Sequence, residues 1–306
     1  MNGIAEKLKE ITSADNIRVD EEMKNHTSFK TGGCADVFVT PGNTREAADI
    51  VRLLLAHDIQ FTVIGNGSNL LVSDKGYRGV IVCMSRGTDH INVSDTGITA
   101  GAGALLSRTA AAAYENGLTG LEFASGIPGS VGGAVVMNAG AYGSEMKEVI
   151  SSVKLFDEKS KDIVTLSVDE MEFGYRTSIV KKHPYVVLEA VFDLQHGIRE
   201  EIKAKTDELA AARRAKQPLE YPSAGSTFKR PEGHFAGKLI EDAGLKGYSV
   251  GGAMVSDKHC GFVINRGGAT SGEILELIKQ IRQKVYDLSK VCLEPEVVLL
   301  GEDMIL

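Results

Sequence analysis

The stretch from Gly126 to Gly143, GIPGSVGGAVVMNAGAYG, constrains the fold of this chain more than any other. A dense run of glycine in an ordered protein needs a compensating reason, because glycine loses the most conformational freedom on folding. The run has neither a collagen period nor the Ser/Gly monotony of a linker. Two explanations stay open: a tight packing corner between sheets, or a loop whose amides bind an anion such as a pyrophosphate.

The composition is that of an ordinary globular protein. The chain has 306 residues, 43% hydrophobic and 25% charged, which suffices for two or three compact units. The net charge is −7 and no basic block is present, which argues against DNA or RNA as the main partner. The four cysteines and seven histidines show no metal-ligand spacing, so we expect no metal site.

The N-terminus is charged and helix-like, without the apolar core of a signal peptide, and no run approaches the length of a membrane span. Scattered cysteines in such a chain are typical of reduced thiols. We therefore expect a cytoplasmic protein without membrane contact. The sequence does not determine the oligomeric state, for which a monomer is the default.

Hydrophobic periodicity and turn signals predict an α+β chain in three units, 1–84, 85–198 and 199–306. Its local signals include Thr44 as an N-cap, Gly117 after a helix, and a capping box from Thr270 to Glu273. The final strand, at 296–300, can belong to the third unit or be shared with the first. The predicted helices are 4–11, 45–58, 104–116, 198–216, 235–244 and one beginning after Thr270, and the predicted strands are 61–64, 79–83, 91–100, 149–156, 163–166, 185–194 and 261–265.

A second glycine-rich loop follows an apolar strand in VIGNGSNLLV, residues 63–72. It is similar to a dinucleotide fingerprint, but Leu70 stands where the third glycine belongs and no helical pattern follows. A Rossmann site is therefore not expected. The alternatives are a simple strand-end turn or a loop whose amides, with Ser68 and Asn69, bind phosphate oxygens. Together with Gly126 to Gly143, it suggests two walls around one long cofactor.

Three further segments carry polar groups suited to chemistry. EFGYRTS contains Tyr175 and Arg176, AGSTFKRP contains Ser226, Lys229 and Arg230, and LEPEV contains Glu296. Each segment alone is better explained without chemistry, as a surface ion pair, a polar loop or an exposed strand start. His259 and Cys260 are adjacent, but catalytic partners usually come from distant segments, so we expect this pair to be structural.

In order and combination, these segments resemble the UDP-N-acetylenolpyruvoylglucosamine reductase family over nearly the whole chain. HTSFKTGG and AGKLIEDAGLKG add to the resemblance. It implies an FAD-binding fold of the vanillyl-alcohol-oxidase type, in which two α+β subdomains hold FAD and a C-terminal α/β domain binds substrate. No insertion follows FGYRTS, so the chain resembles the shorter class, which lacks the tyrosine loop.

The resemblance implies that NADPH reduces FAD and that the hydride then passes to the enolpyruvyl sugar, which yields UDP-N-acetylmuramate for peptidoglycan. NADPH and the UDP-sugar are expected to use one shared pocket in turn. Arg176 would stabilise the developing charge, Glu296 would assist by hydrogen bonding or proton supply, and Ser226 would protonate the α-carbon. The substrate-binding residues implied by the resemblance are Tyr175, Lys216, Lys229 and Arg230. The cofactor-binding residues, on the same ground and on the amide argument, are Gly65, Asn66, Gly67, Ser68, Asn69, Leu70, Gly126, Pro128, Gly129, Ser130, Gly132, Gly133, Asn138, Ala139 and Gly140.

Two rival functions remain. An FAD oxidase acting on a hydroxy acid or sugar would keep the fold, but it would not be expected to carry GSTFKRP and LEPEV together. A flavin-free module that binds a nucleotide sugar would use the glycine loops to hold UDP. Colour separates the second rival, because a flavoprotein is yellow and bleaches with NADPH.

Overall fold

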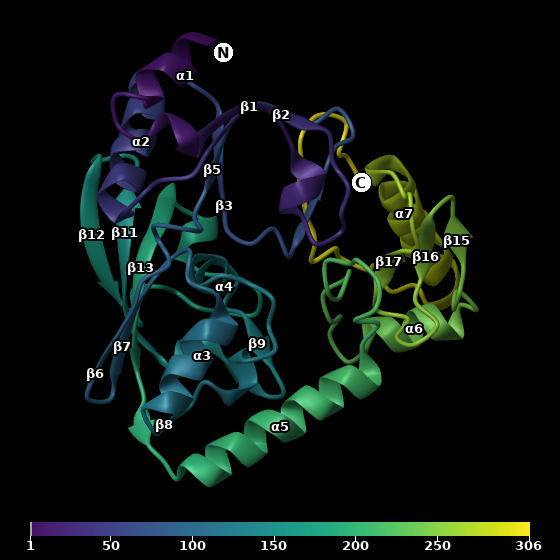
Figure 1. Ribbon diagram of the computed structural model, residues 1–306. Helices are drawn as coiled ribbons and strands as arrows, with labels where there is room; N and C mark the ends of the chain where they lie inside the picture. Colours follow the sequence, from purple (N-terminus) through teal and green to yellow (C-terminus); the bar gives the residue numbers. More distant parts are fainter. Residues whose placement is uncertain (1) are drawn as a thin grey trace. The chain divides into compact units, whose positions relative to one another are not determined.

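The computed structural model describes residues 2–306, which form two compact units (Figure 1). The first unit comprises the chain up to Val19, Val37–Asn66 and Gly79–Arg213. The second unit comprises Asp20–Asp36, Gly67–Arg78 and Arg214–Leu306. The three-part division at residues 84 and 198 stays a prediction.

A four-stranded sheet, in the order β1-β2-β5-β3, contains β1 (Ile17–Glu22), β2 (Cys34–Val39), β5 (Tyr77–Cys83) and β3 (Phe61–Ile64). Strands β3 and β5 are parallel. In the first unit, α1 (Asn2–Leu8) and α2 (Thr44–Ala56) share one buried apolar cluster with this sheet. The N-cap of α2 is Asn43, whose side chain accepts from the amide of Glu46, so the prediction of Thr44 was wrong by one residue.

A five-stranded antiparallel sheet forms the rest of the first unit's frame. Its order is β12-β11-β13-β7-β6. The predicted single strand at 91–100 is wrong, because Asp95 adopts φ +53° and turns the chain into a hairpin. Apolar and polar residues alternate on both sides of this turn, so the sequence pattern did not reveal the turn. The strands are β6 (Ile91–Ser94), β7 (Gly97–Gly101), β11 (Ile150–Asp157), β12 (Asp162–Ser167) and β13 (Tyr185–Asp193).

Two helices lie against this second sheet, α3 (Leu106–Glu115) and α4 (Val131–Met137) (Figure 1). Helix α3 ends as predicted, with Gly117 in the left-handed region at φ +68°. Helix α4 was not predicted and lies inside the glycine-rich stretch. Short strand pairs complete the unit: β8 (Leu118–Thr119) with β14 (Gln195–His196), and β9 (Gly140–Ala141) with β10 (Ser144–Glu145).

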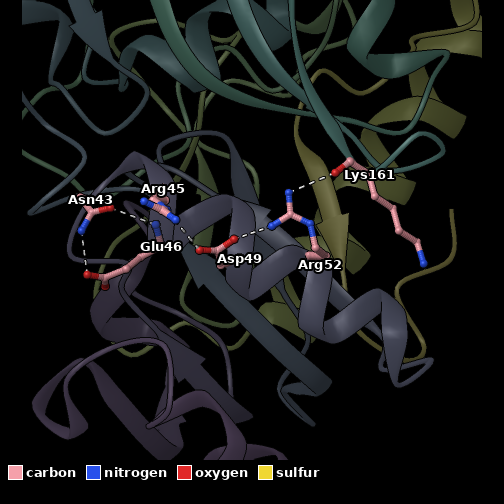
Figure 2. A network of polar contacts seen from close by, with 6 residues as sticks. All are labelled: Asn43, Arg45, Glu46, Asp49, Arg52 and Lys161. Atoms are coloured by element: carbon pink, nitrogen blue, oxygen red, sulfur yellow. Dashed lines mark hydrogen bonds and ion pairs between the residues drawn. The ribbon is translucent and has the colours of Figure 1, made fainter.

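Figure 2 shows the polar network that fastens α2 to the turn between β11 and β12. The Arg52 guanidinium pairs with Asp49 one turn earlier and donates to the backbone oxygen of Lys161 at 3.1 Å. The same guanidinium lies 5.3 Å from the ring centroid of Phe156 on β11. One arginine thus joins a helix to a sheet by two contacts and is held in place by a third within the helix.

The second unit is built on a three-stranded antiparallel sheet, in the order β15-β16-β17. Helix α7 (Ser271–Ser289) packs on it through a broad apolar face and begins at the predicted capping box of Thr270 and Glu273. Helix α6 (Ala236–Asp242) contacts α7. The strands are β15 (Ser249–Val250), β16 (Ala253–Val255) and β17 (Val263–Asn265), and a separate parallel pair joins β4 (Leu70–Val72) to β18 (Val298–Leu300).

Helix α5 (Arg199–Lys216) begins in the first unit and ends in the second. None of the helices between residues 2 and 306 is both long and apolar enough to cross a membrane. Within the same residues, no group of three or more His, Cys, Asp or Glu side chains is arranged to hold a metal ion.

Candidate active site

In the first unit, the two glycine-rich loops lie against each other. A Cβ on Gly65 would lie 2.0 Å from the hydroxyl oxygen of Ser130, so a side chain there would have to displace this hydroxyl. The side-chain amide of Asn66 donates to the backbone oxygen of Pro128 at 2.6 Å. Asn66 and Pro128 are exposed, so this junction has an open face. Two loops that the sequence predicted as walls of one site are neighbours in the fold.

The packing explanation accounts for part of the glycine-rich stretch. A Cβ on Gly132 would lie 2.9 Å from the Cβ of Ala102, which makes this glycine a packing requirement. The amides of Val131 and Gly132 donate to the carbonyls of Ala104 and Ala102, both at 2.8 Å. These amides are occupied within the fold. For Val131 and Gly132, the structure favours the packing explanation that the sequence left open.

Other predicted cofactor residues also hold the stretch together. The Ser130 hydroxyl accepts from the amide of Gly133 at 3.4 Å and caps α4, and the Gly129 carbonyl accepts from Leu106. Buried Asn138 adopts φ +42°, and its side-chain amide donates to Glu145 at 2.8 Å and to the Gly174 carbonyl at 3.1 Å.

Ala139 and Gly140 follow in β9 and the turn before it. The Ala139 carbonyl accepts from Met146 at 3.0 Å, and Gly140 pairs with Glu145. Gly126 lies near the start of the stretch, where a Cβ would be 3.1 Å from a guanidinium nitrogen of Arg213.

Arg176 lies at the tip of a tight turn that contacts the glycine-rich stretch. Gly174 and Thr177 bond each other through both backbone groups, which leaves Tyr175 and Arg176 as the two turn residues. Arg176 adopts φ +55°, a conformation that the third position of a type II turn requires and that glycine or asparagine normally supplies. Its guanidinium lies 3.5 Å from the Gly140 carbonyl and stacks at 5.2 Å over Tyr175.

In the second unit, Ser226 and Glu296 belong to paired segments. The amide of Glu296 donates to the carbonyl of Thr227 at 2.9 Å, so Ser226 immediately precedes the residue that Glu296 pairs with. Ser226 is exposed, whereas Thr227 is fully buried. The side-chain amide of Asn69 donates to the carbonyl of Glu296 at 3.1 Å. Part of the first glycine-rich loop therefore supports the segment that carries Glu296.

The remaining residues of that loop lie in the second unit. A Cβ on Gly67 would lie 1.8 Å from the carbonyl oxygen of His26, and Gly67 adopts φ +59°. Ser68 is half-buried, and Leu70 begins β4, opposite Val298. The part of the loop in the second unit is thus held by a close backbone contact that requires glycine at position 67.

Two of the predicted cations of the second unit, Lys229 and Arg230, have partners within the protein. Lys229 pairs with Glu294 at 3.0 Å, which offsets part of the positive charge expected to bind the substrate. Arg230 stacks over the ring of Phe235 at 4.0 Å. Lys216 is exposed at the end of α5.

Two polar groups near the glycine loops were missed. Arg213 lies among alanines and charges that predict a solvated helix, yet burial lowers the pKa of its guanidinium, with Tyr142 acting in the opposite direction. Ser28 donates its amide to the Gly67 carbonyl at 3.2 Å, and within the described chain its buried hydroxyl has no hydrogen-bond partner. Paired glycines in HTSFKTGG were the available signal for Ser28, whereas no sequence signal marks Arg213.

These observations test whether the chain fits a dinucleotide. In the first unit, the loops lack bulky side chains where they meet, and a guanidinium lies against one of them. Backbone close approach and a cation are what a pyrophosphate needs. The residues of this unit fit FAD, which Gly65, Asn66 and Arg213 would hold.

The comparisons with known proteins give the class of protein first. Residues 35–167 match the model of the FAD binding domain, and the chain is an oxidoreductase of the flavoprotein class. A glucose dehydrogenase, Phl p 4.0202, shares this fold at a TM-score of 0.52 with 14% identity, over 64% of this chain and 44% of that one. The predicted α+β fold with an FAD-binding part and a C-terminal domain is confirmed.

The chain belongs to the UDP-N-acetylenolpyruvoylglucosamine reductase family. Residues 217–300 match the C-terminal domain of that reductase. The reductase of Caldanaerobacter subterraneus is 53% identical over 98% of both chains, and that of Clostridioides difficile is 50% identical over 97% of both. The crystal structure of the Thermus caldophilus reductase has a TM-score of 0.80 and 34% identity, over 93% of this chain and all of that one. The family resemblance read from the sequence is confirmed.

Proposed function

We propose that this enzyme reduces UDP-N-acetylglucosamine enolpyruvate to UDP-N-acetylmuramate, a precursor of peptidoglycan, with NADPH as electron donor. Family membership at high identity supports the reaction. The structural observation that carries it is the pairing of Glu296 with Thr227, because it brings a carboxylate segment beside an exposed serine. FAD, when bound, supplies the hydride chemistry.

Reduction of the enol ether adds a hydride to the β-carbon and a proton to the α-carbon. Negative charge develops on the α-carbon and the carboxylate between these events, so a cation aimed at that carboxylate lowers the barrier. Arg176 suits this role because its planar guanidinium binds a carboxylate through two donors. Its positive φ is a strained conformation of the kind that often marks functional residues.

Ser226 is proposed to donate the proton to the α-carbon. A serine hydroxyl is a weak acid, but the substrate carbanion is a strong base, and the exposed hydroxyl can be reached by a substrate. Glu296 is proposed to orient the reacting group by hydrogen bonding or to resupply the proton. Tyr175, Lys216, Lys229 and Arg230 are proposed to bind the sugar nucleotide, and NADPH is proposed to use the same pocket before it.

The cofactor is proposed to lie along the two glycine-rich loops. Gly65, Asn66, Pro128 and Ser130 meet there in the first unit, and Arg213 lies beside Gly126. A guanidinium next to side-chain-poor backbone suits the two phosphates of a dinucleotide.

One stopped-flow experiment tests the proposal. The yellow protein is bleached anaerobically with NADPH and then mixed with the enolpyruvyl sugar nucleotide, which should restore the colour within the turnover time. Colour that returns quickly with oxygen but not with the sugar would identify an oxidase instead. A colourless protein that binds UDP would identify a binding module.

A further inference from the structure

The loop between β16 and β17 is folded around His259. The Ser256 hydroxyl accepts from the amides of Lys258 and His259 at 3.1 and 3.3 Å. The Phe262 amide donates to the His259 carbonyl at 3.0 Å, and the two rings meet edge to face at 5.1 Å. The half-buried His259 ring is therefore held in one orientation.

The His259 ring holds the next segment through a single hydrogen bond. The amide of Gly261 donates to its Nδ1 at 3.0 Å, which leaves Nε2 as the protonated nitrogen of a neutral ring. A Cβ on Gly261 would lie 2.8 Å from the ring, so glycine is required for this approach. Burial lowers the pKa of His259, the nearby Lys216 lowers it further and its own backbone raises it, so Nδ1 stays an acceptor at neutral pH.

Gly261 in turn holds the residue after Ser226. The Thr227 amide donates to the Gly261 carbonyl at 2.9 Å, and its hydroxyl accepts from the amide of Val263 at 2.9 Å. The Thr227 carbonyl accepts from Glu296. A continuous chain of hydrogen bonds thus runs from the His259 ring to the two segments that carry Ser226 and Glu296.

We propose that His259 is a positioning residue for Ser226 and acts through the backbone of Gly261. The inference rests on the proposed role of Ser226 as proton donor. If the ring loses its acceptor at Nδ1, the two peptide groups that meet at the Cα of Gly261 are free to shift, and Thr227 loses the fixed carbonyl that sets the direction of the preceding serine. A misplacement of about 1 Å at a reacting group can cost on the order of 100-fold in rate.

Three variants separate this role from others. His259→Asn keeps an acceptor at the δ position, His259→Gln moves the acceptor one atom outward, and His259→Leu removes it. We expect His259→Leu and His259→Gln to lower kcat for sugar reduction by about 10- to 100-fold with KM little changed. His259→Asn should recover most of that loss, and bleaching by NADPH should proceed normally in all three. His183→Leu, a change at an exposed histidine in the first unit, is the control.

A double variant gives the decisive readout. In a Ser226→Ala background, His259→Gln should lower the residual rate no further, since both changes remove the same function. A raised KM with unchanged kcat would instead make His259 a substrate contact and overturn the proposal. Equal losses in the Asn and Gln variants, or additive losses with Ser226→Ala, would overturn it too. If the sugar nucleotide does not reoxidise the NADPH-reduced flavin of the wild-type enzyme, the proposed function itself is wrong, whatever the histidine variants show.

Discussion

The backbone amide of Glu296 lies 2.9 Å from the carbonyl oxygen of Thr227 and donates to it. On the other side, Asn69 from the first glycine-rich loop donates its side-chain amide to the Glu296 carbonyl. The glutamate segment is therefore held between the serine loop and the first glycine-rich loop within one compact unit. Protonation of the substrate follows flavin reduction in the proposed reaction, so the two half-reactions can be measured apart.

Ser226→Ala should stall sugar reduction and spare the first half-reaction. The substitution removes one hydroxyl from an exposed position, so the fold should not change. General acid catalysis contributes on the order of 100- to 10,000-fold, and a loss in that range is expected for recolouring by the sugar. Stopped-flow absorbance measures both half-reactions, with Ser249→Ala at another exposed serine as the control. Unchanged turnover would remove Ser226 as proton donor.

Arg176→Ala and Arg176→Gly should both abolish sugar reduction, because the cation is lost in each. They should differ in stability, since alanine keeps the strain of φ +55° and glycine relieves it. We expect the glycine variant to be more stable than the alanine variant by about 1 kcal/mol. Urea unfolding and flavin content are the measurements. If both variants lose the flavin, Arg176 serves the cofactor loop and not the substrate carboxylate.

Gly132→Ala and Gly133→Ala separate packing from cofactor binding within one helix. The first adds a Cβ 2.9 Å from that of Ala102, so a cost of about 1–3 kcal/mol is expected. The second meets only the Ser130 hydroxyl, at 3.6 Å, so the stability of the apoprotein should hold. We expect Gly133→Ala to weaken FAD binding in a fluorescence titration. Normal FAD affinity would place Gly133 away from the cofactor.

Arg52→Ala tests the network in Figure 2. It removes an ion pair with Asp49, a hydrogen bond to Lys161 and a stacking contact with Phe156, and should cost about 1–2 kcal/mol of unfolding free energy. Arg45→Ala is the matched control, because Arg45 is 91% exposed and reaches the same carboxylate only at 3.9 Å. Surface pairs of this kind contribute about 0–1 kcal/mol. Equal losses in both variants would contradict the network's role.

The sequence correctly predicted the ends of helices that depend on residues close together in the chain. The capping box of α7 and the helix stop at Gly117 were correct because each depends on neighbouring residues. Helix α4 was missed because glycine is a poor helix former, and this helix depends on packing against Ala102 and β13.

The site was predictable only in part, for a similar reason. The sequence indicated which loops are poor in side chains, and the structure brings Gly65 against Ser130. The sequence did not indicate which backbone amides form hydrogen bonds within the fold. It also did not indicate that the Arg213 guanidinium lies beside Gly126. Both depend on tertiary contacts.

The last prediction concerns Glu189, which is 14% exposed on β13 between Lys154 at 2.6 Å and His90 at 3.0 Å. Burial alone would raise the pKa of this carboxyl, but hydrogen bonds and charge from Lys154 and His90 outweigh it and lower the pKa below its ordinary value of 4.5. A carboxyl whose pKa is lowered by folding stabilises the protein above its unfolded pKa, and that contribution disappears as pH falls through the folded value.

The unfolding free energy should therefore fall between about pH 5 and about pH 3, and part of that fall should be absent in Glu189→Gln. At neutral pH the same variant should be less stable than wild type, because Lys154 and His90 lose a charged partner. Urea unfolding across this pH range measures both effects, with exposed Glu200→Gln as the control. If the unfolding free energies of the two glutamine variants show the same pH dependence, Glu189 does not contribute to acid unfolding. The contacts of Glu189 with Lys154 and His90 would then stabilise the sheet by packing alone.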